Sequence, residues 1–426
     1  MRHILILGAG KSATILIKTL LEEAGQQHWI IHVADASIGS AVQKVNGHES
    51  GIAYSFTIED ASTWHPLIEL SDLVISMLPP SFHLLVAQQC LKAKKHFLNA
   101  SYLSEAMKNL DEEVTEKGLL FLSEMGLDPG IDHMSAMEIM DNIKEHGGEI
   151  HSFRSHCGGL ISPESDDNPW HYKISWNPKN IITAGKDGAR FLENGQIINM
   201  SYNDLFDPNR TVDIPEIGTY AWYPNRDSLP YKWLYGLDKV KNLVRTTLRH
   251  PDFCAVWNVI VNSGLTIENE LINTKSITYK GYFNEKLNKK TVFSKKINEQ
   301  LSYAGFDDDV LINMGIVSPA YILERKLEET LCLQTTDKDM VVMLHEIEYI
   351  QNGAKKRRRD TLVIKGDNGI HTAMAKTVGL PLAIAAKLLL NGIITRKGVQ
   401  IPICKEIYEP VLKELKIHGI NFKSTF

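Results

Sequence analysis

Residues 3–13 have the sequence HILILGAGKSA, and this stretch decides the fold of the first part of the chain. The apolar run at residues 4–7 predicts a buried strand, and Gly8 and Gly10 follow it directly. Residues 11–23 then carry Ile15, Leu16 and Leu20 at helical spacing. A strand, a glycine turn and a helix in this order are typical of the first unit of a doubly wound parallel sheet.

The glycine turn has a GxGxxA pattern. Its glycines let the main chain turn tightly and approach a pyrophosphate, and the helix that follows offers free N–H groups and the positive end of its dipole to that anion. We therefore expect a dinucleotide at this turn. The predicted cofactor-binding residues here are Gly8, Ala9, Gly10, Lys11, Ser12 and Ala13.

The choice of cofactor depends on Asp35, which follows the second predicted strand at residues 29–34 and precedes Ala36 and Ser37. A carboxylate at this place accepts hydrogen bonds from the ribose hydroxyls of NAD and repels the 2′-phosphate of NADP. No arginine follows within the next several residues. We predict NAD, with NADP as the alternative; a second interpretation of Asp35 is that it caps the next turn.

Further buried strands are predicted at residues 73–78, 97–100 and 119–123, with helical patterns between them. Such units cross over right-handed and build one α/β sheet, so residues 1–126 are predicted to form a Rossmann domain. Ligands bind where the strands of such sheets end. Leu78 and Ala100 end two of these strands, and Ser101 and Tyr102 follow Ala100, so we expect all four at the ligand crevice, with Leu78, Ala100 and Ser101 as cofactor contacts.

Composition narrows the class of protein. A chain of 426 residues exceeds one ordinary core, and 43% hydrophobic with 23% charged residues describes a globular protein. The net charge, 46 − 51 = −5, is too small to indicate a nucleic-acid or membrane partner. Five scattered cysteines without a CxxC pair favour a reducing compartment. Since no apolar stretch approaches the roughly 20 residues that span a bilayer, we expect a cytoplasmic location.

The stretch at residues 126–134, GLDPGIDHM, resembles the motif of saccharopine dehydrogenases and saccharopine reductases of the glutamate-forming type. Other stretches match that family in order, and together they span nearly the whole chain. They are Ser101-Tyr102, Cys157-Gly158-Gly159, Pro163-Glu164, Asn168-Pro169, Tyr172-Lys173, Ser175-Trp176, residues 223–228, Thr247-Leu248-Arg249 and residues 373–379.

The resemblance implies an oxidoreductase of lysine metabolism that acts on a CH–NH bond. In the family's reaction a nicotinamide cofactor oxidises saccharopine to an imine, and hydrolysis gives L-glutamate and 2-aminoadipate 6-semialdehyde; the reverse is a reductive condensation. Saccharopine carries three carboxylates, so its site needs fixed cations. Arg226 and Arg249 offer bidentate guanidinium groups for that purpose, although each could instead pair with an acid such as Asp227.

The resemblance also assigns site residues. Ser101, Tyr102 and Asp128 match positions that contact substrate, and we expect Tyr102 and Asp128 to be catalytic, through the imine nitrogen and the proton transfers of hydrolysis. The alternatives are that Tyr102 only packs and that Asp128 caps a helix beginning near Ile131. Cys157 is expected to be a supporting contact and no nucleophile. The remaining implied residues are Thr247 and Leu248 for substrate, and Leu127, Asp128 and Pro129 for cofactor.

Two positions depart from the family pattern. NADP-dependent members resemble one another in a Cys-Arg-Thr sequence after the second strand, where this chain has Asp35-Ala36-Ser37. After the third strand the family often has an aspartate and a hydrophobic residue, where this chain has Thr57-Ile58. All five residues are kept as predicted cofactor contacts, and the missing arginine favours NAD.

Beyond the Rossmann domain, we expect an α+β substrate domain at residues 127–229 and 331–370, with a mostly helical insertion at 230–330. Residues 341–350 alternate as a strand, and Asn352-Gly353 predicts a hairpin. The basic run at 355–359 is interpreted as a solvated edge. The C-terminal segment, 371–426, is predicted to pack back on the Rossmann domain through a helix at 371–392.

No metal site is predicted, because Asp132-His133 lacks a second histidine or cysteine at ligand spacing. Three alternatives to the main hypothesis stay open. They are the same chemistry run biosynthetically with NADPH, an opine- or polyamine-type imine reductase with another substrate, and a non-catalytic protein that senses redox state. The partners are small molecules, and a homodimer is an open expectation.

Overall fold

The computed structural model describes residues 1–288 and 292–425. The chain folds into two compact units, and each is assembled from separate stretches of sequence. The first unit comprises Met1–His146 and Ile370–Asn421, and the second comprises Gly147–Gly369 and the residues from Phe422 onward. The first unit therefore continues past residue 126, where the sequence analysis placed a boundary.

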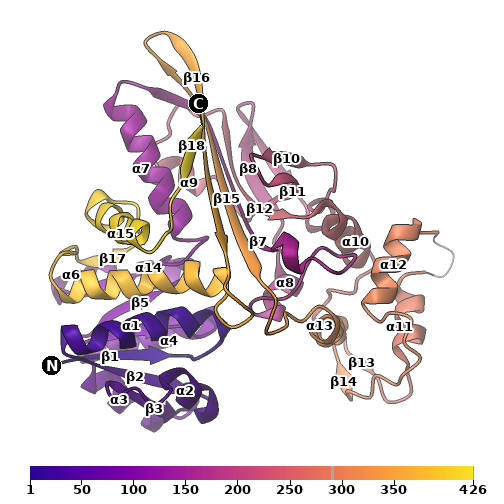
Figure 1. Cartoon of the computed structure of the whole chain (residues 1–426), viewed down its shortest axis with the longest axis horizontal. Coiled ribbons are helices and arrows are strands. Elements are labelled where there is room, and N and C mark those ends of the chain that lie inside the picture. Colours follow the sequence, from indigo (N-terminus) through magenta and orange to yellow (C-terminus); the bar gives the residue numbers. More distant parts are fainter. Residues whose placement is uncertain (289–291, 426) are drawn as a thin grey trace. The chain divides into compact units, whose positions relative to one another are not determined.

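A parallel sheet of seven strands forms the first unit (Figure 1), in the order β17-β6-β5-β4-β1-β2-β3. The neighbours β1 and β4 mark the point where the strand order reverses, as in a doubly wound sheet. The predicted Rossmann fold is thus confirmed. The strands are β1 (Arg2–Leu7), β2 (Trp29–Asp35), β3 (Gly51–Ser55), β4 (Leu73–Ser76), β5 (His96–Asn99), β6 (Leu120–Leu122) and β17 (Gly398–Gln400).

Helices connect these strands. The chain passes from β1 through a short 3₁₀ turn, Lys11–Ala13, into the first helix. The helices of this unit are α1 (Thr14–Gln27), α2 (Ile38–Val45), α3 (His65–Leu70), α4 (His83–Ala93), α5 (Glu105–Lys108), α6 (Asp111–Glu116), α7 (Ile131–Glu145), α14 (Ala373–Leu390) and α15 (Lys405–Ile417). Helix α7 belongs to this unit, where its Asp141 accepts a 2.6 Å hydrogen bond from Tyr408 of α15.

Helix α14 confirms the predicted return of the C-terminal segment to the Rossmann unit. It lies alongside α1 (Figure 1), and a side chain at Gly379 would approach the main-chain nitrogen of Leu16 to 2.6 Å. By length and composition α14 is the one described helix that could cross a membrane, but 78% of that stretch is buried inside the protein. These features are those of a core helix.

The second unit is built on a mixed sheet. Its main strand order is β10-β11-β12-β7-β15-β16-β18, with β8 pairing β12 and β9 pairing β8. Strands β7 and β12 run parallel, and the other pairs are antiparallel. The strands are β7 (Glu149–Ile161), β8 (Ala189–Glu193), β9 (Gln196–Met200), β10 (Thr211–Ile214), β11 (Gly218–Pro224), β12 (Asn242–Arg249), β15 (Asp339–Gln351), β16 (Ala354–Lys365) and β18 (Lys423–Thr425).

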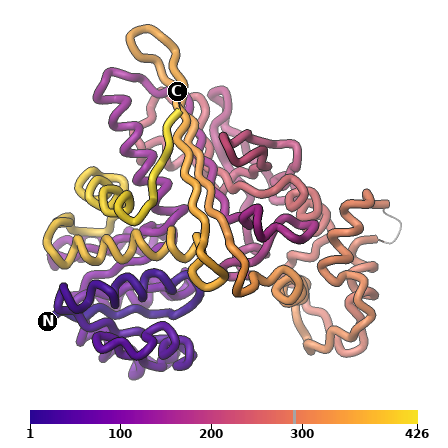
Figure 2. The backbone as a smooth tube through the Cα atoms, viewed as in Figure 1, coloured from indigo at the N-terminus to yellow at the C-terminus, as the bar shows by residue number. Residues whose placement is uncertain are grey.

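Strands β15 and β16 form the predicted hairpin, seen as two long orange segments side by side in Figure 2. Asn352 and Gly353 both have positive φ, at 53° and 75°, as a tight two-residue turn requires. The basic run lies on β16, where Arg357 and Arg359 pair with Glu346 of β15 and Arg358 pairs with Asp360. Each of these arginines thus has a carboxylate partner in its own sheet, although Arg357 stays 58% exposed.

Residues 230–330, expected to be a mostly helical insertion, contain five helices in the described part of the chain and also one long strand. Strand β12 lies inside this range and pairs with both β7 and β11. The sequence hid this strand because Arg245 and Arg249 interrupt its apolar pattern, yet both are buried, 2% and 5% exposed. The other elements there are α9 (Pro230–Leu234), α10 (Pro251–Asn262), β13 (Ile272–Asn273), α11 (Tyr279–Lys286), α12 (Lys295–Tyr303), β14 (Ile316–Val317) and α13 (Pro319–Thr330).

An aromatic-rich core supports these helices together with α8 (Pro178–Thr183). Trp170, Phe253, Trp257 and Phe283 are among its fully buried side chains. Phe253 and Trp257 stack with their ring centroids 5.4 Å apart. This core fixes the start of α10, which directly follows the end of β12 and its Arg249.

Candidate active site

The glycine turn after β1 is shaped by one required glycine. Gly8 has φ of +103°, and a side chain there would lie 3.0 Å from the main chain of Met77. Its N–H donates to Ala34 at the end of β2 over 2.8 Å. Any other residue at position 8 would therefore strain the backbone and collide with the strand beside it.

Gly10 has a different reason to be small. Its φ is −67°, and a side chain there would meet no protein atom within 4 Å. Within the described part of the chain, the N–H groups of Gly10, Lys11 and Ser12 donate to no protein acceptor. Neither backbone conformation nor packing demands this glycine, so the open space and free donors fit a phosphate group approaching the helix N-terminus. The turn therefore fits the pyrophosphate of a dinucleotide.

Asp35 anchors this turn. One carboxylate oxygen accepts from the N–H of Ala9 at 2.7 Å, and the other accepts from the N–H of Ser37 at 2.8 Å. The expected turn-capping role is thus present, and a cofactor role is compatible with it because each carboxylate oxygen has a second acceptor site. Ala36 beside it is exposed, and Ser37 caps α2 through a hydrogen bond with Ser40.

The other predicted cofactor residues lie after neighbouring strands of the same sheet. Thr57 and Ile58 follow β3, and a hydrogen bond of 3.1 Å from Thr57 N–H to Thr63 shapes their loop. Leu78 follows β4 and Ala100 follows β5. Because these strands are parallel, their carboxyl ends share one edge of the sheet with the glycine turn.

The GLDPG stretch closes on itself at this edge. A side chain at Gly130 would lie 2.1 Å from the main-chain oxygen of Gly126, and the N–H of Gly126 donates to Pro129 over 3.0 Å. Leu127 is buried. Asp128 is half-buried, and its carboxylate accepts a 3.0 Å hydrogen bond from the hydroxyl of Tyr102. The structure thus brings together the two residues predicted to be catalytic.

The N-cap position of the helix that follows, α7, is taken by Gly130 and not by Asp128. Instead Asp132 accepts from the N–H of Gly130 at 2.6 Å. The Asp132-His133 pair, considered above as a metal motif, therefore has structural partners: Nε2 of His133 lies 2.7 Å from a carboxylate oxygen of Glu124.

Glu124 is a residue that sequence reasoning missed. Its N–H donates to Ser101 O at 3.0 Å, and its carboxylate accepts from Leu103 N–H at 2.9 Å. Glu124 thereby holds the main chain on both sides of Tyr102. It is 4% exposed and has φ of +61°, an unfavourable conformation for a non-glycine residue. This strain suits a residue that positions its neighbours.

His83 is a second missed residue. Its ring nitrogens lie 2.9 Å from Ser76 Oγ and 2.9 Å from Ser101 Oγ, so it bridges the ends of β4 and β5. Burial lowers the pKa of His83 to about 4, so the ring is neutral at physiological pH. A neutral ring with one donor and one acceptor nitrogen fixes the Ser101 hydroxyl.

Of the predicted substrate residues of the second unit, four lie together at the end of β12, namely Cys157, Thr247, Leu248 and Arg249. Arg226 lies apart from them, beside the middle of β12. Arg249 is 5% exposed, and its guanidinium packs over the rings of Tyr172 and Phe253, at 5.3 and 5.5 Å from their centroids. It donates to the main-chain oxygens of Leu248 and Gly159 at 2.8 and 3.4 Å. Its Nε has no hydrogen-bond partner, and no acidic side chain of the described residues pairs with it.

A buried cation without an anionic partner is costly, so Arg249 is suited to receive a carboxylate from outside the protein. The expected alternative, an ion pair with a neighbouring acid, is not present among the described residues. Asp227 pairs with Arg190 instead, at 3.1 Å.

Thr247 and Cys157 are direct neighbours across β12 and β7. Thr247 shares a strand face with Arg249, whereas Leu248 points the other way into the fully buried core of the sheet. Leu248 approaches so closely that a side chain at Gly158 would lie 2.7 Å from it. The predicted contact of Leu248 with substrate could therefore involve only its main chain. Arg226 has φ of +56° and follows β11; its carbonyl accepts from Arg190 N–H at 3.0 Å.

A doubly wound sheet with an open, donor-lined glycine turn, followed by a half-buried Tyr–Asp pair, defines a nicotinamide-dinucleotide oxidoreductase. Comparison with known families narrows this class. Residues 4–122 match the saccharopine dehydrogenase NADP binding domain, and residues 126–420 match the saccharopine dehydrogenase C-terminal domain. The chain belongs to the saccharopine dehydrogenase family, and it is an oxidoreductase of lysine metabolism.

Individual relatives agree. The chain is 32% identical to the saccharopine dehydrogenase [NADP(+), L-glutamate-forming] of Saccharomyces cerevisiae, with 99% of this chain and 98% of the relative covered. It is 34% identical to the mitochondrial alpha-aminoadipic semialdehyde synthase of Mus musculus over 99% of its own length but only 48% of that longer protein. A solved structure of the apo yeast enzyme superimposes with a TM-score of 0.89 at 30% identity, covering 100% and 99% of the two chains.

Proposed function

We propose that this chain interconverts saccharopine with L-glutamate and 2-aminoadipate 6-semialdehyde, and that NAD is its preferred cofactor. The observation that carries the substrate is Arg249, a buried guanidinium with no acidic partner among the described residues. A substrate with three carboxylates supplies the missing anion. The printed names of the fungal relatives, which state the L-glutamate-forming reaction, support the same assignment.

In the oxidative direction, the secondary amine of saccharopine becomes an imine, because the carbon next to nitrogen loses a hydride and the nitrogen loses a proton. Water then adds to the imine, and the C–N bond breaks. The nicotinamide ring, when bound, accepts the hydride. The tasks left to the protein are to hold the carboxylates and to move protons.

Tyr102 and Asp128 suit the proton transfers. A hydrogen bond of 3.0 Å joins the Tyr102 hydroxyl to the Asp128 carboxylate. When the hydroxyl takes a proton from the substrate, it can pass its own proton to this carboxylate, and the proton can return when the hydroxyl donates one to the substrate. Glu124 holds the main chain on either side of Tyr102, and His83 holds the Ser101 hydroxyl. We propose Tyr102 and Asp128 as the catalytic pair, with Ser101 as a binding residue.

The preference for NAD rests on Asp35. Its negative charge stands at the end of β2, tied to the glycine turn through Ala9, where it can accept from ribose hydroxyls and disfavours a 2′-phosphate. A second candidate is the NADP-dependent reaction, because the matching domain and the fungal relatives carry NADP in their names. The names of the animal and plant relatives state no cofactor.

The deciding experiment follows the absorbance of reduced cofactor when purified protein meets saccharopine, with NAD and NADP in parallel. A higher kcat/KM with NAD supports both the substrate and the role of Asp35. A higher kcat/KM with NADP keeps the substrate and establishes the second candidate. Binding of either dinucleotide without turnover of saccharopine would contradict the proposed substrate.

The cellular location and the assembly state remain predictions. All five cysteines are free, in keeping with a reducing compartment such as the cytoplasm. A homodimer can be tested by light scattering on the purified chain.

A further inference from the structure

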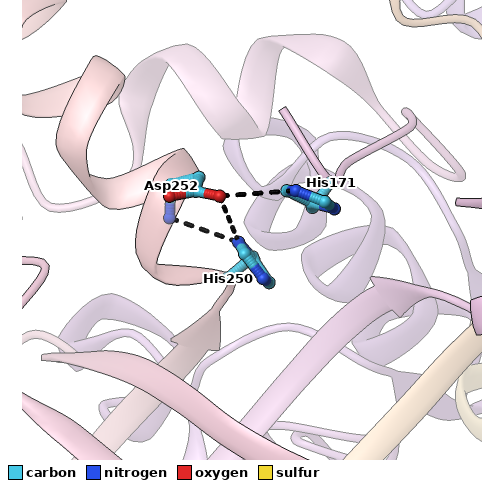
Figure 3. Close-up of side chains that lie close together, drawn as sticks. All are labelled: His171, His250 and Asp252. Carbon is cyan, nitrogen blue, oxygen red and sulfur yellow. Dashed lines mark hydrogen bonds and ion pairs between the residues drawn. The ribbon is translucent and has the colours of Figure 1, made fainter. Parts of the chain in front are cut away.

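A cluster of two imidazoles and a carboxylate lies in the second unit, away from the residues assigned above except for its neighbour in sequence, Arg249. Figure 3 shows its members, His171, His250 and Asp252, turned toward one another. His171 lies in the loop after the 3₁₀ turn Pro163–Ser165, and His250 and Asp252 begin α10. Their side chains are 32%, 32% and 15% exposed, so an ion from solvent could reach them.

The distances within this cluster match a metal site. Oδ2 of Asp252 lies 3.3 Å from Nε2 of His171 and 3.3 Å from Nδ1 of His250. Ligand atoms about 2.0–2.1 Å from a tetrahedral zinc ion are about 3.3 Å from one another. All three ligand atoms lie within 4.8 Å of one another.

The hydrogen bonds of the two histidines are compatible with metal binding. Nδ1 of His171 lies 2.7 Å from a carboxylate oxygen of Asp166, the contact by which a metal-binding histidine is commonly oriented. This contact leaves Nε2 of His171 on the side of Asp252. Nδ1 of His250 accepts the N–H of Asp252 at 3.2 Å, so this nitrogen carries the lone pair of the ring, and a metal ion would take the place of that N–H.

The cluster already has a cationic neighbour. Nζ of Lys296 of α12 lies 2.6 Å from the same Oδ2 of Asp252. The Lys296 side chain is 59% exposed and unbranched, so it can swing into solvent when another cation binds. Lys296 therefore competes with a metal ion for the carboxylate of Asp252.

We propose that His171, His250 and Asp252 bind a divalent transition metal of the zinc class, with a fourth position open to water. Two imidazoles and one carboxylate suit Zn²⁺ better than Mg²⁺ or Ca²⁺, which prefer oxygen ligands. The ion would join the loop at Asp166 to the start of α10. The prediction that no metal binds considered only residues close in sequence, whereas these ligands come together through the fold.

The test uses the full-length chain without a polyhistidine tag, treated with chelator and then titrated with Co²⁺. Tetrahedral Co²⁺ bound by nitrogen and oxygen gives visible absorption, which Zn²⁺ should abolish by displacement. We expect a single saturating site and a rise in melting temperature with Zn²⁺ that Mg²⁺ does not produce.

Variants locate the site. His171→Asn and His250→Asn should each weaken Co²⁺ binding by at least about 10-fold, and Asp166→Asn by about 10- to 100-fold. Lys296→Met, a change at an exposed side chain that leaves the fold intact, should tighten binding because it removes the competing cation. His28→Asn is the matched control, since His28 is exposed and adopts a left-handed conformation that asparagine tolerates.

Absence of a Co²⁺ band in both the wild type and the Lys296→Met variant would overturn the proposal and leave the cluster as an ion-pair network around Lys296. Equal affinities in the wild type, His171→Asn and His250→Asn would overturn it as well, because the metal would then be bound elsewhere.

Discussion

The glycine turn of the first unit and the end of β12 in the second unit differ in the sign of their charged group and in how that charge is compensated. The turn presents free N–H groups beside a half-exposed carboxylate, Asp35, that is satisfied by main-chain donors. The end of β12 holds a buried cation, Arg249, between aromatic rings, and no acidic side chain of the described residues pairs with it. The charged group of the first arrangement has its partners without a ligand, whereas the second arrangement is left with an uncompensated charge. Substitutions should therefore affect stability and activity differently in the two regions.

The largest effect is expected at the Tyr102–Asp128 pair. Tyr102→Phe and Asp128→Asn should each lower kcat by about 10²- to 10⁴-fold, because a positioned proton donor or acceptor contributes this much to catalysis. Steady-state rates with saccharopine at saturating cofactor measure the change. Tyr321→Phe, at a tyrosine that is 45% exposed on α13, is the control. A loss below tenfold in both variants would remove the pair from the chemistry.

Arg249→Met should lower kcat/KM for saccharopine by about 30-fold or more, the cost of about 2–5 kcal/mol for losing a buried charge pair with the substrate. The KM for cofactor should stay the same. The melting temperature should not fall, because an unpaired buried charge is replaced by an apolar side chain. Arg190→Met, at an exposed arginine paired with Asp227, is the control. A large drop in stability would show that Arg249 is a structural cation and would break the contrast between the regions.

Asp35→Ala tests the cofactor preference that we attribute to the glycine turn. Loss of hydrogen bonds to a charged acceptor, about 1.5–3 kcal/mol, should reduce the kcat/KM ratio of NAD to NADP by about 10- to 100-fold. The ratio is measured with both cofactors at fixed saccharopine. Asp60→Ala is matched to it, since Asp60 also accepts a main-chain N–H but caps a loop after β3. An unchanged ratio would count against the NAD preference proposed here.

Substitution of His83 is expected to have the smallest effect on activity but a clear effect on the pH dependence of stability. Burial lowers its pKa in the folded protein from 6.5 to about 4, so between these values the unfolded chain binds more protons. Stability due to His83 is full above pH 6.5 and falls as the pH approaches 4, by about 3 kcal/mol in all. His83→Asn should flatten the melting temperature against pH in this window relative to the His28→Asn control. An identical slope in the two variants would mean that His83 is protonated in the folded protein.

Much of the first unit could be predicted because its information is local. A strand, a glycine turn and a helix are contiguous in residues 3–13, and Asp35 follows at the end of the next strand. Gly8 is an example. Its φ and its contact with Met77 allow no other residue, so a glycine at this position of the sequence indicates the backbone geometry of the turn. The hairpin at Asn352-Gly353 was predictable for the same reason, since two positive φ angles require such residues.

The second unit was harder to predict because burial is decided by distant partners. The sequence of strand β12 resembles that of an amphipathic helix, with its arginines as the polar side. Only the fold shows that Tyr172 and Phe253 cover the guanidinium of Arg249. Glu124 and His83 were missed since their roles depend on contacts with Leu103 and Ser101 that no spacing records.

By itself, the sequence determined the Rossmann fold, the family and the place of the dinucleotide, because glycine turns and strand periodicity act over a few neighbouring residues. The tertiary structure decided which charges are paired and which are left open. It gave Asp35 main-chain partners, left Arg249 with no acidic partner in the described part of the chain, and brought His171 to His250 and Asp252. The physical reason is that electrostatic free energy depends on distance and burial in three dimensions, and neither is encoded in the order of residues alone.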